Sequence, residues 1–165
     1  MGSGKSTVGP ALAAQLGVGF VDLDSAIEAS SGRTIPEWFE TRGEPAFREA
    51  ERAELAGRLE RTKAGVVIAL GGGAFAEPAT RTLLAKRACT VWLDVPLEVI
   101  RSRIVADGGR PLYRDPADVA RLFAARQAAY AEADIRIDGE AGTDAVVSRI
   151  LSALTARFGS DAGGA

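Results

Sequence analysis

The sequence of 165 residues contains no histidine, the side chain most often used as a general base and as a zinc ligand. Any catalytic chemistry must therefore depend on Asp, Glu, Lys, Arg and Ser side chains. There is a single cysteine, Cys89, so no disulfide can form within the chain. Cys89 precedes a run of strand-forming residues, and we interpret it as a buried structural thiol rather than as a nucleophile.

The chain also lacks a long apolar run and an excess of charge of one sign. No stretch of about 18 apolar residues occurs, so we expect no transmembrane helix and no membrane partner. No signal peptide is visible, and we expect a cytoplasmic protein. The 20 basic residues against 22 acidic ones argue against nucleic acid as the main partner. A length of 165 residues with 47% hydrophobic residues suits one soluble domain.

The first seven residues, MGSGKST, match only the second half of a phosphate-binding loop, G-x-x-x-x-G-K-[ST]. Gly2 and Gly4 allow backbone N–H groups to curl around phosphate oxygens, and a helix follows at residues 5–16. Lys5 can reach the β- and γ-phosphates, and Ser6 can ligate Mg²⁺. The alternative is a glycine-rich turn without function. Such a loop normally follows a buried strand, and we expect that strand to be absent from this chain.

Short apolar runs alternate with helical patterns along the rest of the sequence. This alternation predicts an α/β fold with three layers, in which helices cover both faces of a parallel sheet. Near the C-terminus, residues 143–158 form a helical pattern with five apolar residues at core spacing: Val147, Ile150, Leu151, Leu154 and Phe158. Four strands are predicted, at residues 19–24, 65–70, 89–95 and 134–138, and the absent first strand would be the central one.

Two carboxylates close the first predicted strand. If residues 19–24 are extended, Asp22 and Asp24 point to the same face, at the strand end where ligands bind in open α/β sheets. One can approach Mg²⁺, and the other can hold a substrate hydroxyl. Alternatively, Asp24 is only the N-cap of the next helix.

Further along, Arg48 and Glu51 lie three residues apart on a predicted helix and therefore on one face. Such a pair is most often a solvated ion pair, but Arg48 could instead grip a carboxylate with its two-pronged guanidinium. The apolar strand at 65–70 runs into Gly71-Gly72-Gly73. Three consecutive glycines indicate a place where a ligand approaches the main chain closely.

A glycine- and proline-rich segment, at about residues 106–116, is predicted to be a mobile lid. Gly108 and Gly109 permit hinging, and Arg110 could reach the transferred phosphoryl group. Arg126 is a lone arginine on a predicted helix, which by itself favours a surface charge.

Together these motifs resemble one family, the shikimate kinases, which are small P-loop kinases of the nucleoside monophosphate kinase type. The resemblance covers residues 1 to about 154. The motifs occur in the family's order: GSGKST, D-x-D, GE-x-x-FR-x-x-E, GGG, RPL and R-x-x-x-Y. The resemblance implies transfer of the γ-phosphoryl of MgATP to the 3-hydroxyl of shikimate, which gives shikimate 3-phosphate in aromatic amino acid biosynthesis. It also implies a monomer.

The resemblance assigns roles to residues of this sequence. Asp24 would bind the shikimate hydroxyls and act as the base, and Asp22 would orient Mg²⁺ through water. Lys5 and the lid residue Arg110 would act on the phosphates, and Arg103 would lie against adenine. The remaining shikimate contacts implied are Phe39, Phe47, Arg48, Glu51, Gly72, Gly73 and Arg126. The loop residues implied to bind ATP are Gly2, Ser3, Gly4, Lys5, Ser6 and Thr7.

Two other functions stay open at this stage. One is another small-molecule P-loop kinase, such as a gluconate kinase, against which the GGG and FR-x-x-E stretches argue. The other is a truncated, non-catalytic binding protein that lacks a complete sheet. In either case we expect a single domain at residues 1–158 and a flexible tail at 159–165. The segment after Asp138 lacks a basic residue that some family members place near adenine, so the adenine contacts are left open.

Overall fold

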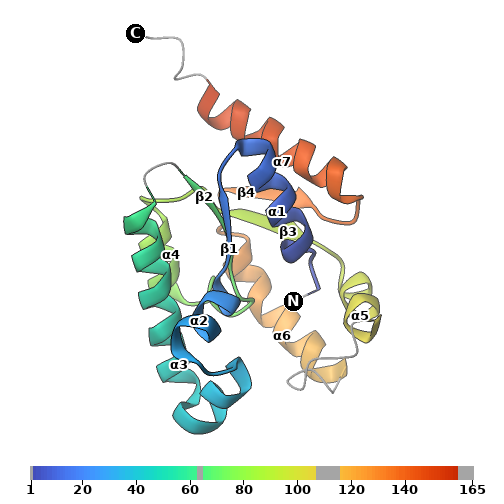
Figure 1. The fold of residues 1–165 in the computed structure, drawn as a ribbon. Helices are drawn as coiled ribbons and strands as arrows, with labels where there is room; N and C mark the ends of the chain where they lie inside the picture. Colours follow the sequence, from blue (N-terminus) through green and yellow to red (C-terminus); the bar gives the residue numbers. More distant parts are fainter. Residues whose placement is uncertain (1, 63–64, 107–115, 160–165) are drawn as a thin grey trace. The chain divides into compact units, whose positions relative to one another are not determined.

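A computed structural model describes residues 2–62, 65–106 and 116–159 (Figure 1). Most of the predicted lid, including Arg110, and all but the first residue of the predicted tail lie outside these ranges. The chain divides into two compact units, one formed by Met1–Leu12 and Cys89–Ala165 and the other by Ala13–Ala88. Helix α1 (Lys5–Leu16) begins in the first unit and ends in the second.

The second unit contains a parallel pair of strands and three helices. Strand β1 (Gly19–Asp22) pairs with β2 (Val66–Ala69), in a register that places Gly19 opposite Val66 and Asp22 opposite Ala69. Because the strands are parallel, their carboxyl ends meet at one edge, and the residues that follow them are brought together. The helices of this unit are α2 (Leu23–Ser31), α3 (Ile35–Arg61) and α4 (Pro78–Leu84).

Strand β1 ends two residues earlier than the sequence predicts. Asp22 is the N-cap of α2, and its Oδ1 accepts a hydrogen bond from the backbone N–H of Ser25 at 3.2 Å. Asp24 lies in the first turn of α2, so the prediction that Asp22 and Asp24 share one face of a strand is wrong. The physical reason is that a carboxylate which caps the first turn starts the helix at the next residue. Figure 1 shows α2 following directly on β1.

Helix α3 begins with a complete capping box. Thr34 accepts from the backbone N–H of Glu37, and Glu37 accepts from the backbone N–H of Thr34 at 2.7 Å. The bond from the Thr34 backbone N–H, and a second from the Thr34 hydroxyl at 2.9 Å, lower the pKa of Glu37. The helix bends at Gly43, where φ is 76° and ψ is 166°, so it consists of two helical segments in sequence. The second segment carries the side chains of interest below.

The second unit has its own hydrophobic core between α2, α3 and α4. Phe47 is 2% exposed and lies in this core. In strand β2 only Ala69 is buried, and Val66, Val67 and Ile68 are half-buried although the strand is apolar throughout. Among the strands described, β2 pairs with β1 alone. The fully buried members of this core are Leu23, Ile27, Phe47, Leu55 and Leu84.

The first unit contains a second parallel pair. Strand β3 (Val91–Asp94) pairs with β4 (Ile135–Asp138), with Val91 opposite Ile135 and Asp94 opposite Asp138. Burial alternates along β4, where Ile135 and Ile137 are buried while Arg136 and Asp138 are exposed. The helices are α5 (Leu97–Ala106), α6 (Pro116–Tyr130) and α7 (Thr143–Phe158), together with the start of α1.

Helix α7 packs against β4 through one apolar stripe (Figure 1). Val147 and Ile150 are buried in this stripe as predicted, and Val146 joins them. Phe158, predicted to belong to the core, is 51% exposed, because it stands at the last turn of the helix, beyond the strand that the helix covers. Its ring lies 5.8 Å from the guanidinium carbon of Arg157.

The observed architecture confirms the predicted α/β class with parallel strand pairs. Within the described ranges, no helix is long and apolar enough to cross a membrane. Cys89 is half-buried, and burial is the main reason that the pKa of its thiol is raised, with a smaller contribution from Asp134. A raised pKa keeps the thiol protonated, which fits the structural role predicted for it.

Candidate functional site

The phosphate loop of the first unit has the backbone conformation that its glycines permit. Gly2 and Gly4 have φ angles of +59° and +87°, in the left-handed region that other residues rarely adopt. The carbonyl of Gly4 accepts from the backbone N–H of Thr7 at 3.0 Å and of Val8 at 2.8 Å, which starts α1. The first turn of a helix therefore faces the loop, as an anion site requires.

Side chains of the same unit support this loop. The Nζ of Lys5 donates to Oγ of Ser3 at 3.3 Å, so the lysine folds over the loop. From α5, Arg103 donates through Nη1 to the carbonyl of Gly2 at 3.1 Å, and Ile100 packs against Gly2. Arg103 thus contacts the loop itself in this structure, and the adenine contact expected for it stays a prediction.

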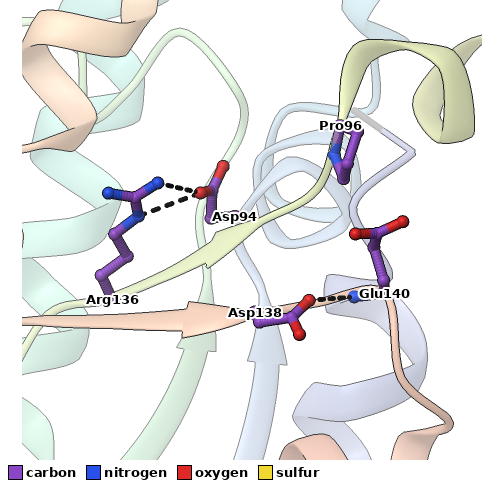
Figure 2. A pocket seen from close by; sticks show the side chains of 5 residues that line it. All are labelled: Asp94, Pro96, Arg136, Asp138 and Glu140. Atoms are coloured by element: carbon purple, nitrogen blue, oxygen red, sulfur yellow. Dashed lines mark hydrogen bonds and ion pairs between the residues drawn. The ribbon is translucent and has the colours of Figure 1, made fainter.

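A cavity of about 490 Å³ lies at the carboxyl ends of β3 and β4 (Figure 2). Asp94 is bonded to Arg136, whose Nε lies 2.9 Å from its Oδ2, and Asp138 accepts from the backbone N–H of Glu140 at 3.0 Å. Pro96, which lines this cavity, directly precedes α5, and Ile100 of this helix packs against Gly2 of the phosphate loop. The lining residues are Asp94, Pro96, Arg136, Asp138 and Glu140.

In the second unit, the guanidinium of Arg48 is held between two carboxylates of the same helix. Its Nη1 donates to Glu51 Oε2 at 2.6 Å, and its Nε and Nη2 donate to Glu44 Oε1 at 3.2 and 3.0 Å. The side chains of Arg48 and Glu51 are only 11% and 2% exposed. The pair is therefore buried, and the solvated ion pair considered from the sequence is wrong.

Two of the three consecutive glycines lie against these charged groups. A Cβ atom on Gly73 would stand 2.2 Å from Nη2 of Arg48. A Cβ on Gly71 would stand 2.7 Å from Oδ1 of Asp24 and 2.9 Å from Oε1 of Glu51. The backbone thus closely approaches side chains of the chain itself, which explains why glycine occupies these positions.

Burial and ion pairing shift the pKa values of Glu51 and Arg48 in opposite directions. Burial outweighs pairing for Glu51, whereas pairing outweighs burial for Arg48. Burial raises the pKa of Glu51, Arg48 opposes this, and the nearby carboxylates of Asp24 and Glu77 add to the rise. Burial lowers the pKa of Arg48, but its bonds to Glu51 and Glu44 outweigh this and give a net rise. The short 2.6 Å hydrogen bond supports a charged pair, within which burial disfavours the charged form of Glu51. Its Oε1 is buried without a hydrogen-bond partner among the described residues.

Aromatic rings lie beside this pair. Arg48 stands 5.3 Å from the ring of Phe47, which contacts Phe39 at 5.1 Å and Trp38 at 6.4 Å between centroids. Phe47 is buried in the core, whereas Phe39 is partly buried and keeps surface to offer a ligand. Of the two aromatic residues that the resemblance implies as shikimate contacts, Phe39 is therefore the better placed.

The structure brings together a subset of the predicted site residues: Asp24, Phe39, Phe47, Arg48, Glu51 and Gly73. Asp22 ends β1 in the same unit, while Ser6 and Arg126 belong to the other unit, so their joint roles with it stay predictions. Sequence reasoning assigned no role to Glu44, and it gave Gly71 only the close approach to a ligand expected for all three glycines. The i,i+4 spacing between Glu44 and Arg48, which is typical of ion pairs on helices, could have identified Glu44 as a partner of Arg48.

Comparisons with known proteins show which family the chain resembles. The family model described as shikimate kinase matches residues 1–155. The shikimate kinase of Paramagnetospirillum magneticum is 43% identical over 158 residues, which cover 93% of this chain and 80% of that protein.

The chain belongs to the shikimate kinase family. Solved structures of the family share its fold. The shikimate kinase of Acinetobacter baumannii, solved in complex with shikimate, has a TM-score of 0.88 and 34% identity, covering 96% of this chain and 90% of the other. The shikimate kinase of Aquifex aeolicus has a TM-score of 0.84 and 37% identity, covering 96% and 95%.

Proposed function

We propose that this shikimate kinase family member transfers the γ-phosphoryl group of ATP to the 3-hydroxyl of shikimate. The observation that carries the proposal is the buried Arg48–Glu51 pair against Gly73, next to Asp24. Shikimate is a small anion with one carboxylate and three hydroxyls. A guanidinium grips a carboxylate through two parallel hydrogen bonds, and a neighbouring carboxylate accepts hydrogen bonds from hydroxyls.

Within the second unit, each residue has a chemical task. Arg48 binds the substrate carboxylate, and Glu51, fixed in the interior, holds the guanidinium in orientation. Asp24 accepts hydrogen bonds from the hydroxyls and takes the proton from the attacking oxygen. Gly72 and Gly73 offer backbone N–H groups, and Phe39 lies along the ring. In the other unit, Arg126 provides a second charge for the carboxylate.

In the first unit, the loop around Gly2 and Gly4 cradles the phosphates, with Ser3, Ser6 and Thr7 contributing polar atoms. Lys5 neutralises charge on the β- and γ-phosphates, and Arg110 assists on the transferred group. The cavity of Figure 2 is lined by three acidic residues, which disfavour phosphate there. The cavity suits the hydroxyl and amino groups of a nucleoside, and Arg103 contacts the phosphate loop.

An ATP-using kinase requires a divalent cation, and we propose Mg²⁺. The donors available, the Ser6 hydroxyl and the Asp22 carboxylate, are the hard oxygen ligands that Mg²⁺ accepts, and sites of this kind use few protein ligands plus phosphates. No group of three or more acidic or thiol ligands occurs in the described ranges, which is compatible with such a sparse site. When bound, the ion neutralises charge that develops on the phosphates.

The test is a coupled assay of ADP release with ATP, Mg²⁺ and shikimate, with the product identified by mass and phosphorus NMR. Shikimate 3-phosphate is the expected product. Turnover of gluconate without turnover of shikimate would instead favour the alternative function of a gluconate kinase. If calorimetry detects shikimate binding but no MgATP binding, the chain is a binding protein and the proposal fails. Sedimentation checks the monomer that we also propose.

A further inference from the structure

Each of the three nitrogen atoms of the Arg48 guanidinium donates to a carboxylate of its own helix. Its Nη1 is bonded to Glu51, and its Nε–Nη2 edge is bonded to Glu44 Oε1 at 3.2 and 3.0 Å. Among the described residues, these two carboxylates are its only ion-pair partners. A ligand carboxylate that takes the Nε–Nη2 edge of Arg48 must therefore replace Glu44.

The two partners differ strongly in burial. The side chain of Glu51 is 2% exposed, whereas that of Glu44 is 60% exposed. Glu51 cannot leave without carrying a charge through the interior, but Glu44 needs only to rotate into water. Exposed ion pairs of this type are weak, because solvent screens them and two long side chains must be held in one geometry.

The geometry also selects the edge that a ligand can reach. The Nη1 side is closed by Glu51, and the guanidinium lies against the backbone of Gly73 and near the ring of Phe47. The Nε–Nη2 edge is the side whose partner is at the surface. Parallel hydrogen bonds from Nε and a terminal nitrogen are one of the ways in which a guanidinium binds a carboxylate.

We propose that Glu44 is a placeholder for the substrate carboxylate: it occupies the Nε–Nη2 edge of Arg48 in the free chain, and the incoming carboxylate displaces it. The inference rests on the proposed function, since it takes shikimate as the ligand of Arg48. The placeholder keeps the guanidinium oriented and paired while the site is empty. It also lowers the apparent affinity for the substrate, because binding first requires the exchange.

The size of this effect follows from the occupancy of the Glu44 contact. A competing contact that is populated about three to five times more than the open state weakens apparent binding roughly four- to sixfold. Removing it should strengthen shikimate binding by that factor. The rate of phosphoryl transfer at saturation should be unchanged, because Glu44 has left the edge before the reaction.

The test is a calorimetric titration of shikimate into the full chain and its Glu44→Gln variant, followed by steady-state kinetics. Glu44→Gln should lower the dissociation constant and the KM for shikimate roughly four- to sixfold, with kcat and the KM for ATP unchanged. Glu54→Gln is a matched control, because Glu54 pairs with Arg58 at the same i,i+4 spacing on the same helix. It should leave binding unchanged.

A second control separates displacement from a general loss of negative charge. Glu40 is exposed on α3 before the bend at Gly43, and Glu40→Gln removes the same charge from a residue that does not pair with Arg48. The methyl ester of shikimate, which lacks the carboxylate, should bind equally to the parent chain and to Glu44→Gln.

Several results would overturn the proposal. Unchanged or weaker binding in Glu44→Gln would mean that Glu44 supports Arg48 during binding. Equal strengthening by Glu40→Gln would mean that only the net field matters. If the parent chain itself binds no shikimate, the proposed function fails, and the placeholder inference falls with it. Thermal unfolding of each variant, expected within a few degrees of the parent, confirms that all of them fold.

Discussion

The two glycine-rich segments of this chain use the same residue for different physical reasons. In the phosphate loop, Gly4 has a φ of +87°, and a Cβ there would have no neighbour nearer than 3.8 Å. Space is available, and the backbone conformation is what requires glycine. At 71–73 the opposite holds: the φ angles are ordinary, and a Cβ on Gly73 would meet Arg48 at 2.2 Å.

This difference separates what each segment can recognise. A loop of left-handed glycines turns its N–H groups inward and suits phosphate, which needs many donors and no particular side chain. The segment at 71–73 packs closely against charged side chains of α2 and α3, and such an arrangement suits a small ligand with a defined pattern of charge and hydroxyls. Substitutions in the two segments should therefore affect different substrates.

The largest effect is expected for Gly73→Ala. The added methyl group must push the guanidinium away from its position, and because only the end of one side chain moves, the fold should survive. Loss of a two-pronged charged contact should weaken shikimate binding on the order of 100-fold. The KM for ATP should stay within twofold, and steady-state kinetics with both substrates varied measures the two effects. An unchanged KM for shikimate would show that Arg48 does not bind it.

Gly71→Ala should affect the reaction step more than binding. Its Cβ would stand 2.7 Å from Asp24 and 2.9 Å from Glu51, so two carboxylates must move. We expect kcat to fall about 30-fold, within the range for a displaced acid–base group, and stability to fall by about 1–3 kcal/mol from overpacking. Urea unfolding and single-turnover rates measure these effects. A stability loss with normal kcat would remove Asp24 from the role of base.

Gly4→Ala should act on the nucleotide alone. A left-handed alanine costs roughly 1–2 kcal/mol, which distorts the loop and should raise the KM for ATP about tenfold. Gly17→Ala is the matched control, since Gly17 has a φ of +68° with no atom within 4 Å of the added group. The control should lose similar stability and keep its KM for ATP. Equal kinetic effects in both variants would mean that the loop variant acts only through instability.

The smallest effect is a pH dependence at Glu51. Its folded pKa is raised above the ordinary 4.5, mainly by burial, so the folded chain holds this proton more tightly than the unfolded chain. The stability that this adds is present below pH 4.5 and is lost as pH rises through the folded pKa. The unfolding free energy of the parent minus that of Glu51→Gln should therefore fall as pH rises from 4.5. A difference that grows with pH would show that pairing with Arg48 outweighs burial.

Much of this could be predicted from the sequence, because local signals were strong. The helix predicted after the loop, at residues 5–16, is α1 (Lys5–Leu16). The sequence did not reveal that Asp22 caps α2, because residues 22–24 are compatible both with the end of a strand and with a capped helix start. The exposure of Phe158 also depends on where β4 ends relative to α7, which the spacing within the helix does not show.

Sequence spacing pointed to several residues that the structure brings together, but it did not show their contacts. Spacing placed Arg48 and Glu51 on one face, yet only the fold shows that the pair is buried. Gly71 and Gly73 were expected to approach a ligand, whereas the structure shows the chain's own carboxylates and guanidinium against them. Periodicity describes one element at a time, and these contacts join α2, α3 and the segment after β2.

The most direct test of the account is a calorimetric titration of shikimate into two variants of one helix, Arg48→Lys and Arg58→Lys. Both arginines pair with a glutamate four residues before them, but Arg58 is 35% exposed and Arg48 is 11% exposed. Lysine keeps the charge and loses the two-pronged geometry, so Arg48→Lys should weaken binding about 30- to 100-fold. Arg58→Lys should leave binding unchanged. Normal affinity in Arg48→Lys, or equal losses in both variants, would contradict the assignment of Arg48 as the carboxylate site.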